Sequence, residues 1–219
     1  MSQQRLRITF AKGGDLRFIS HLDLKVVWER ALRRAWVPLA YSQGYNPQAK
    51  LQLASGLPLG YTGAAEVMDV MLTESMSPEE FVKRVDPALP EGLNIVAVEE
   101  APTESPSLQS ALHQAMYRVI LETALPADEL TTRINNLLAS DHLEQQRIRK
   151  GRTETFDLRP LVDDVWLESS GDDQAVLSMR LSAGQHGNVR PDAVLAALGL
   201  ENAPTQVERT KLIFKFDRI

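Results

Sequence analysis

The sequence of 219 residues contains no cysteine, and this absence excludes several kinds of site at once. Without thiolates the chain has no disulfide, no cysteine-held zinc and no thiolate-held iron–sulfur cluster. It also has no run of about 18 apolar residues, so the sequence predicts no membrane span. The first ten residues, MSQQRLRITF, lack the apolar centre of a signal peptide. We therefore expect a cytoplasmic protein.

Histidine is scarce as well, with four residues scattered along the chain without the spacing of metal ligands. We expect no metal and no cofactor. His21 lies beside Asp23 at a predicted helix start and is the one candidate for a general acid or base. Ser20 is its neighbour, but no nucleophile-elbow pattern surrounds it. We expect no catalytic activity of the chain's own, with catalysis by His21 as the alternative.

Charge is distributed unevenly within a formal net charge of −5. Residues 1–50 carry nine Lys or Arg and three Asp or Glu, whereas residues 51–110 carry two and ten. Such segregation indicates either an anion-binding face built by the first segment or mutual neutralisation of the two segments. Both interpretations stay open from the sequence. The negative net charge argues against a general nucleic-acid binder.

The first half of the chain has the pattern of an α+β domain. RLRITFAK at residues 5–12 alternates as a half-buried strand. Ser20 and Asp23 resemble a capping box, which predicts a helix from about residue 21 to residue 36, before Pro38. On this helix the apolar residues fall on one arc that faces the core: Leu24, Val27, Trp28, Ala31, Leu32 and Ala35.

Further strands are predicted at KLQLAS, AAEVMDVMLT and LNIVAVEEA, with a helix between the last two that has Ser77 as its cap and Pro78 at its first position. The order β-α-β-β-α-β is typical of ferredoxin-like domains. Residues 101–110, APTESPSLQS, have the composition of a linker. A similar order of elements then follows. The sequence therefore predicts two tandem ferredoxin-like domains, at residues 1–103 and 111–219.

The first helix carries a basic back outside its apolar arc. Glu29 lies four residues from Lys25 and from Arg33, so ordinary side-chain pairs account for those two cations. Arg30 and Arg34 are four residues apart and have no acid at helical spacing, which costs roughly 0.2–0.5 kcal/mol unless something satisfies them. Either they bind an anion, or Arg34 interacts with its own helix C-terminus and Arg30 meets an acid from residues 51–110.

A second basic cluster lies in the segment RIRKGRTETFDLRP, residues 147–160. Its cations are Arg147, Arg149, Lys150, Arg152 and Arg159. Alternation places Arg147 and Arg149 on one side of a strand, and Lys150 and Arg152 on a turn. Five cations against two acids favour contact with a phosphate backbone over a solubility role.

Two glycine-containing loops, SQGYNPQAK and residues 184–188, would let backbone amides approach a ligand, although tight turns explain them equally. Aromatic residues near the first loop could stack on bases or cover a sheet edge: Tyr41, Tyr45 and Tyr61.

Three motifs together are specific: R-F-x-S-H-L-D-L, R-A-x-R-R-A and S-x-G-x-N-P, all within residues 17–47. With them the chain closely resembles the uncharacterised radical SAM-linked protein family over most of its length, most strongly over residues 5–72. The resemblance implies a radical S-adenosylmethionine protein as partner, since family members follow such a protein or are fused to one. Some members are joined to ribonuclease E/G-type enzymes. The family often has a histidine where this chain has Gln48, so no loop histidine is essential here.

From these observations we expect an RNA-binding accessory module that acts with a radical SAM protein in tRNA or rRNA modification or processing. The residues expected to contact RNA are Arg17, His21, Arg30, Arg33, Arg34, Lys50, Arg147, Arg149, Lys150 and Arg152. One alternative is a metal-independent ribonuclease or RNA-modifying enzyme that uses His21. Another is a protein-interaction subunit that binds no RNA.

Overall fold

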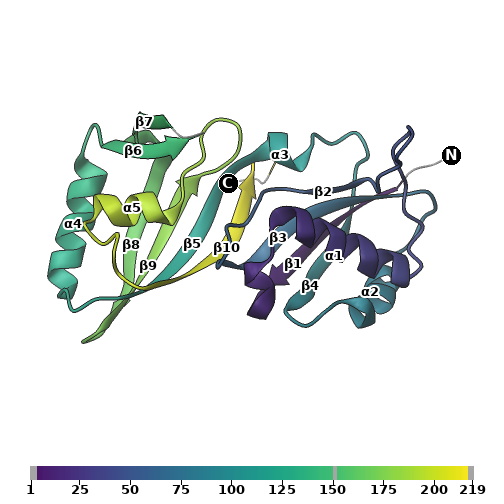
Figure 1. Ribbon diagram of the computed structural model, residues 1–219, viewed down its shortest axis with the longest axis horizontal. Helices are drawn as coiled ribbons and strands as arrows, with labels where there is room; N and C mark the ends of the chain where they lie inside the picture. The colour runs from purple at the N-terminus through teal and green to yellow at the C-terminus, as the bar shows by residue number, and fades with distance from the viewer. Residues whose placement is uncertain (1–3, 150–151, 217–219) are drawn as a thin grey trace. The chain divides into compact units, whose positions relative to one another are not determined.

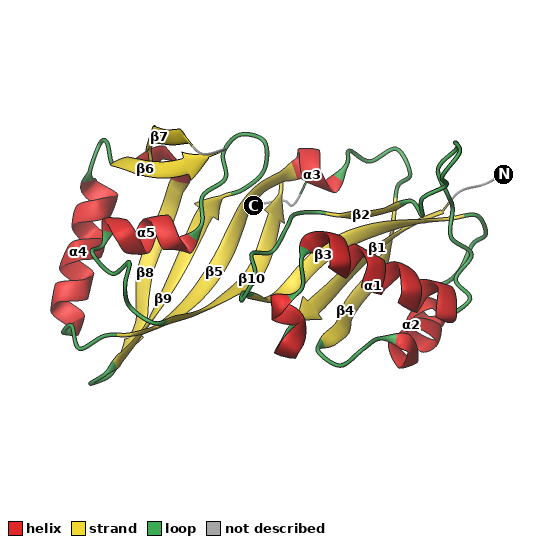
Figure 2. Cartoon of the chain, in the orientation of Figure 1, coloured by secondary structure: helices red, strands yellow, loops and turns green. Residues whose placement is uncertain are grey.

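Helices and mostly antiparallel strands alternate along the chain, which gives an α+β architecture (Figures 1 and 2). The computed structural model describes residues 4–149 and 152–216. Backbone contacts divide the chain into two units. Unit 1 comprises residues 1–112 and 214–219, and unit 2 comprises residues 113–213.

Unit 1 is built around strands in the order β4-β1-β3-β2, with antiparallel neighbours. Its elements are β1 (Gln4–Lys12), η1 (Gly14–Phe18), α1 (His21–Arg34), β2 (Leu51–Leu53), β3 (Thr62–Leu72), α2 (Pro78–Val85), η2 (Asp86–Ala88), β4 (Leu93–Ala101) and α3 (Leu108–Ala111). The predicted order β-α-β-β-α-β is thus the observed order. The short helix α3 lies where the sequence predicted only a linker.

The core of unit 1 follows from the alternation of β1. Leu6, Ile8 and Phe10 point to one face of the sheet and are fully buried. Helix α1 covers that face, and the ring of its Trp28 meets Phe10 edge-on with 5.1 Å between centroids. The predicted apolar arc of α1 therefore faces the core.

Both long helices of unit 1 begin at the predicted caps. The Ser20 hydroxyl accepts a hydrogen bond from the Asp23 backbone N–H at 3.2 Å at the start of α1. At the start of α2, the Ser77 hydroxyl accepts from the Glu80 backbone N–H at 3.2 Å. Each cap satisfies a backbone donor that has no partner inside the helix.

Helix α1 ends at Arg34, two residues earlier than the sequence predicted. The next residue but one, Trp36, has φ 55° and is the one non-glycine residue with positive φ among those described. Its N–H donates to the Arg33 carbonyl at 3.1 Å, and the Val37 N–H donates to the Leu32 carbonyl at 3.1 Å. These two bonds define a Schellman motif with tryptophan at the left-handed position, which glycine usually occupies.

Unit 2 repeats the strand order as β10-β5-β9-β8 and adds a hairpin, β6-β7, which forms its own small sheet. Its elements are β5 (Leu112–Glu122), α4 (Ala127–Ala139), β6 (Glu144–Arg149), β7 (Arg152–Asp157), η3 (Arg159–Leu161), β8 (Val162–Ser170), β9 (Gln174–Ser182), α5 (Pro191–Ala197) and β10 (Thr205–Phe214). Apart from the hairpin and the 3-10 turn η3, the order is again β-α-β-β-α-β.

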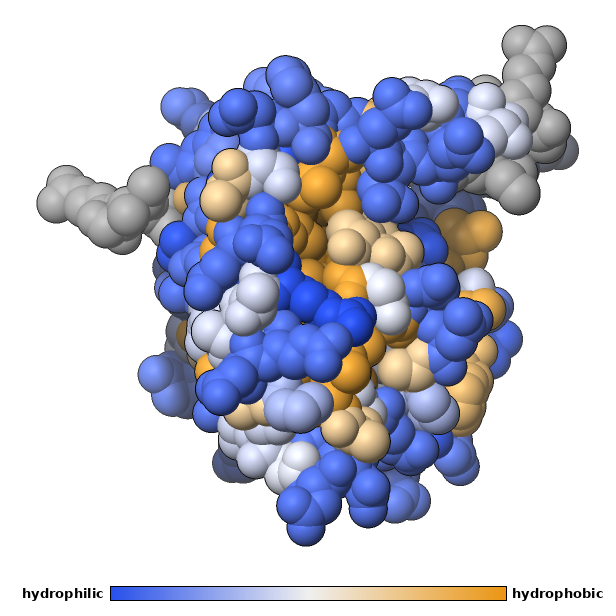
Figure 3. Space-filling view, turned by 90° about the vertical axis from the view of Figure 1, so that its left-hand side faces the viewer, coloured by the Kyte–Doolittle hydropathy of each residue, from blue (hydrophilic) through white to orange (hydrophobic). Residues whose placement is uncertain are grey.

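The helices bury most of their apolar residues against the sheets. Seen from the side on which α4 lies, the surface is largely hydrophilic, with a narrow band of apolar residues between hydrophilic flanks (Figure 3). Among the described residues, no helix combines the length and apolar character that crossing a membrane requires.

Candidate anion-binding site

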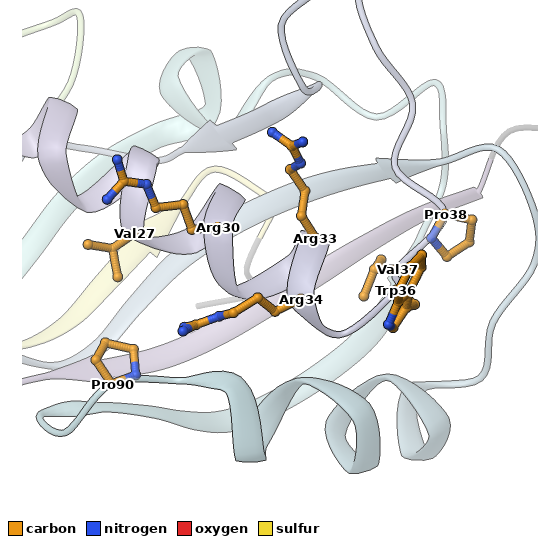
Figure 4. Close-up of a pocket in the computed structure, with 8 residues that line it drawn as sticks. All are labelled: Val27, Arg30, Arg33, Arg34, Trp36, Val37, Pro38 and Pro90. Atoms are coloured by element: carbon orange, nitrogen blue, oxygen red, sulfur yellow. The ribbon is translucent and has the colours of Figure 1, made fainter.

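A cavity of about 920 Å³ lies along the C-terminal half of α1 in unit 1 (Figure 4). We call it the arginine groove, and its lining residues are Val27, Arg30, Arg33, Arg34, Trp36, Val37, Pro38 and Pro90. None of these eight residues is acidic, so the lining carries three positive charges and no negative one. Such an unbalanced lining attracts anions.

Two of the three arginines keep their charge open to a ligand. The side chains of Arg30 and Arg33 are exposed, and neither makes a hydrogen bond or ion pair with another residue in the described part of the chain. The local pairing of Arg33 with Glu29 that the sequence predicted is not formed, nor does an acid from residues 51–110 reach Arg30. The open pair is therefore Arg30 and Arg33, and not Arg30 and Arg34.

The third arginine is held in place by a neutral group. Arg34 donates from Nη2 to the carbonyl oxygen of Ala88, the last residue of η2, at 2.6 Å. The sequence led us to consider the carbonyls of its own helix as the partner. Figure 4 shows Arg34 extending from α1 toward Pro90, while Arg33 points in another direction. Because a carbonyl carries no net charge, this bond orients Arg34 without neutralising it.

Sequence reasoning missed Trp36. Had the helix continued to residue 36, its side chain would have lain beside Leu32 on the buried arc. The left-handed turn instead directs the indole outward, where it is 85% exposed. The signal that could have revealed it is Pro38, since a helix usually ends before the residue preceding proline.

The remaining predicted residues of the first helix region lie outside the groove. Arg17 belongs to η1, and its guanidinium lies over the Phe18 ring, 4.7 Å from the ring centroid. His21 is the first residue of α1 and is half-buried, with its ring beside Gly56, where a Cβ would lie 3.9 Å away. Neither residue lines the arginine groove, so the residues expected to contact RNA do not all lie at one site.

Lys50 lies at a different cavity of unit 1, of about 290 Å³. Arg5 and Asp69 line the same cavity. The buried carboxylate of Asp69 is shared by two guanidiniums, that of buried Arg5, with Nε 2.8 Å from Oδ2, and that of partly buried Arg7, with Nε 3.0 Å from Oδ1. Arg5 also donates to the Ser105 carbonyl at 2.7 Å, which ties the predicted linker to β1. The network around Asp69 therefore stabilises unit 1 internally.

The second basic cluster belongs to unit 2. Arg147 and Arg149 lie in β6, and Arg149 is opposite Arg152 in the register of the hairpin, so Arg152 begins a strand and not a turn. Lys150 lies outside the described residues. Arg159 is half-buried and donates to two backbone carbonyls at 3.1 and 2.5 Å, so it serves the fold and not a ligand.

One carboxylate fastens the base of this hairpin. Asp157 accepts from the Leu143 N–H at 2.8 Å and from the Arg159 N–H at 3.1 Å, and its other oxygen lies 2.9 Å from His142 Nδ1. The bond from Leu143, followed by the one from His142, lowers the pKa of Asp157 from its ordinary value of 3.8. A hydrogen bond from Ser178, followed by one from Arg118, lowers the pKa of Glu168 in the same unit.

The predicted glycine loop of unit 2 lines a polar cavity of about 830 Å³ together with residues of β6, β7 and α5. Among its polar lining residues are Gln145, Gln146, Gln185, His186, Asn188 and Arg190. Of the aromatics near the loop of unit 1, Tyr45 is fully exposed, whereas Tyr61 is buried and offers no face for stacking. Within the described ranges, no cluster of histidine and acidic side chains has the arrangement of a metal site.

Two solved structures have similar backbones. The Cbf5-Nop10-Gar1 complex matches with a TM-score of 0.56 and 13% identity, over 97% of this chain and 50% of that one. The archaeal box H/ACA sRNP Nop10-Cbf5 complex matches with a TM-score of 0.52 and 11% identity, over 97% and 49%. The chain thus spans about half the length of either structure. At these identities the likeness concerns the fold alone.

None of the curated proteins compared with the chain matches it. One family profile does, and it covers residues 5–191, which is most of the sequence, including nearly all of residues 1–112 and the larger part of unit 2. The chain therefore belongs to the bacterial family described as "Uncharacterized protein conserved in bacteria (DUF2344)".

Proposed function

We propose that the protein binds RNA through the arginine groove, as a module of two ferredoxin-like domains with no catalytic step of its own. The observation that carries the proposal is the open pair, Arg30 and Arg33, in a lining without acids. Guanidinium groups donate paired N–H groups to phosphate oxygens, and the RNA backbone presents phosphates in series along a groove. The similarity in fold to a box H/ACA sRNP protein supports an RNA ligand over a small anion.

The proposal is tested by replacing the open pair. Binding of fluorescently labelled tRNA and rRNA fragments is measured by polarisation for the wild type and for the Arg30→Ala/Arg33→Ala double variant. The wild type should bind at micromolar concentration or tighter, and the double variant should bind at least about tenfold more weakly, since each lost phosphate contact lowers affinity for every sequence.

Lys25→Ala is the matched control, because Lys25 is a cation of the same helix that does not line the groove. It should bind as the wild type does. Equal binding by the wild type and the double variant would contradict the proposal, as would the absence of any RNA binding. Gel analysis of the recovered RNA also tests the alternative of cleavage by His21.

We further propose that the module works in the cytoplasm beside a radical S-adenosylmethionine protein that modifies the bound RNA. The motifs shared with the radical SAM-linked family support this partner. Co-purification of the tagged chain from bacterial cells, with and without nuclease treatment, tests it. A partner retained after nuclease treatment supports direct contact, and a preparation without such a protein contradicts the proposal. Limited proteolysis within residues 101–110 would support the domains at residues 1–103 and 111–219.

A further inference from the structure

We infer that the arginine groove binds single-stranded RNA, with one unstacked base lying against the indole of Trp36. The inference rests on the proposed function and adds the form of RNA that the site accepts. It begins from a conflict at one residue: an apolar side chain is 85% exposed on a backbone that disfavours it.

The conformation of Trp36 is unfavourable on local grounds. In the left-handed region the Cβ of an L-residue crowds the neighbouring carbonyl oxygen, which is why glycine prevails at this position of a Schellman motif. Burial of a large side chain would normally offset that cost, but the indole is almost entirely in water. Strained residues of this kind concentrate at ligand sites, where the surrounding structure holds them.

The surrounding structure does hold this turn. Leu32 and Val37 are buried on either side of it and are joined by the hydrogen bond from the Val37 N–H to the Leu32 carbonyl. From α2, Arg84 forms an ion pair with Glu80 and a long hydrogen bond, 3.5 Å, to the Trp36 carbonyl. The backbone at Trp36 is thus anchored on both sides, and the indole projects from a fixed base.

The cavity that Trp36 lines also contains the arginines that a nucleotide phosphate would need. Trp36 follows Arg33 by three residues and lines the same cavity as Arg30 and Pro38 (Figure 4). Every base presents a flat π-face to an aromatic ring, and base–aromatic stacking accepts all sequences. In a duplex the two faces of each base are already stacked, whereas loops and single strands leave them available. A platform in the same cavity as two open arginines therefore suits a single strand.

The test compares two RNA forms and two tryptophan variants. The probes are a single-stranded decanucleotide of mixed sequence and a blunt RNA duplex of the same length. Trp36→Gly should lower affinity for the single strand about tenfold, within the range measured for one stacked base. Trp36→Phe retains a ring and should lose less than about threefold. Binding of the duplex should be the same for the wild type and both variants.

Fluorescence provides a second readout of stacking. The single strand should quench the emission of the wild type, and the quenching should be much reduced in Trp36→Phe, because Trp28 is buried and Trp166, in β8, does not line the groove. The thermal midpoint of each variant is measured first; glycine is the residue that this turn prefers, so Trp36→Gly should remain folded.

The outcomes separate the inference from the proposed function. If Arg30→Ala/Arg33→Ala loses the single strand while Trp36→Gly binds it as the wild type does, the stacking inference is wrong and RNA binding stands. Equal loss of duplex and single strand in Trp36→Gly would also overturn the inference. If neither RNA form binds the wild type, the proposed function fails, and the inference that rests on it fails as well.

Discussion

Trp36 shows how one backbone angle decides what a side chain can do. With φ at 55° the residue cannot continue α1, and its ring leaves the apolar arc on which a longer helix would have buried it. Two hydrogen bonds and the buried residues on either side keep the angle in place. The backbone strain at Trp36 therefore does not depend on a ligand, and its effect on stability can be measured on the free protein.

Trp36→Gly should stabilise the protein by about 1 kcal/mol, because glycine adopts the left-handed conformation without crowding its Cβ. Urea denaturation of the wild type and the variant measures the change in the free energy of unfolding. Trp36→Ala is the matched control, since it removes the indole and keeps the Cβ, and it should gain much less. If alanine and glycine stabilise equally, backbone strain is not the cause.

At the scale of the element, α1 was predictable where its causes are local. The hydroxyl of Ser20 and the spacing of the apolar residues lie within a few positions of the groups that they serve, so the start and the buried face followed from sequence. The C-terminus and the arginines did not. Arg34 finds its partner 54 residues away at Ala88, and no sequence pattern indicates a contact at that distance.

The hairpin β6-β7 offers a prediction about pH. Its base is fastened by Asp157, whose pKa lies below 3.8 in the folded protein because the carboxylate accepts hydrogen bonds from Leu143, His142 and Arg159. A carboxylate with a lowered pKa contributes stability above its unfolded pKa, and this contribution is lost as pH falls through the folded value. Protection of the Leu143 amide should therefore persist at pH 5 and decline below about pH 4.

Hydrogen exchange of the Leu143 amide, followed by NMR from neutral to acidic pH and corrected for intrinsic rates, measures this decline. Asp157→Asn is the control, because asparagine retains an acceptor oxygen but does not titrate. In that variant the acid-dependent loss should disappear. The same loss in both proteins would mean that another group controls the hairpin base.

At the scale of the whole molecule, the net charge of −5 opposes any RNA ligand while the lining of the arginine groove attracts it. The basic segment and the acidic segment noted in the sequence both fall within unit 1. Neutralisation between them is incomplete at Arg30 and Arg33. The likeness to the longer solved structures concerns the fold alone and says nothing about the charges of the groove.

This balance predicts a shallow dependence of binding on salt. Three groove arginines release about three counterions, so the logarithm of the association constant for a single strand should fall with the logarithm of salt concentration with a slope of about −2. Titrations between roughly 50 and 200 mM KCl measure the slope. Arg30→Ala should reduce its magnitude by about 0.7, and a slope steeper than about −5 would place the binding surface elsewhere.

The bond between Arg34 and Ala88 has a consequence for the entropy of binding. A free arginine side chain loses about 2 kcal/mol of rotamer freedom when a ligand immobilises it. Arg34 is already held by a carbonyl 2.6 Å away, so its ordering accompanies folding and not association. A phosphate that reaches the groove would meet one cation in a fixed position and two that can adapt. The site thereby combines one arginine of fixed position with two mobile arginines, which can adjust to the variable shape of an RNA backbone.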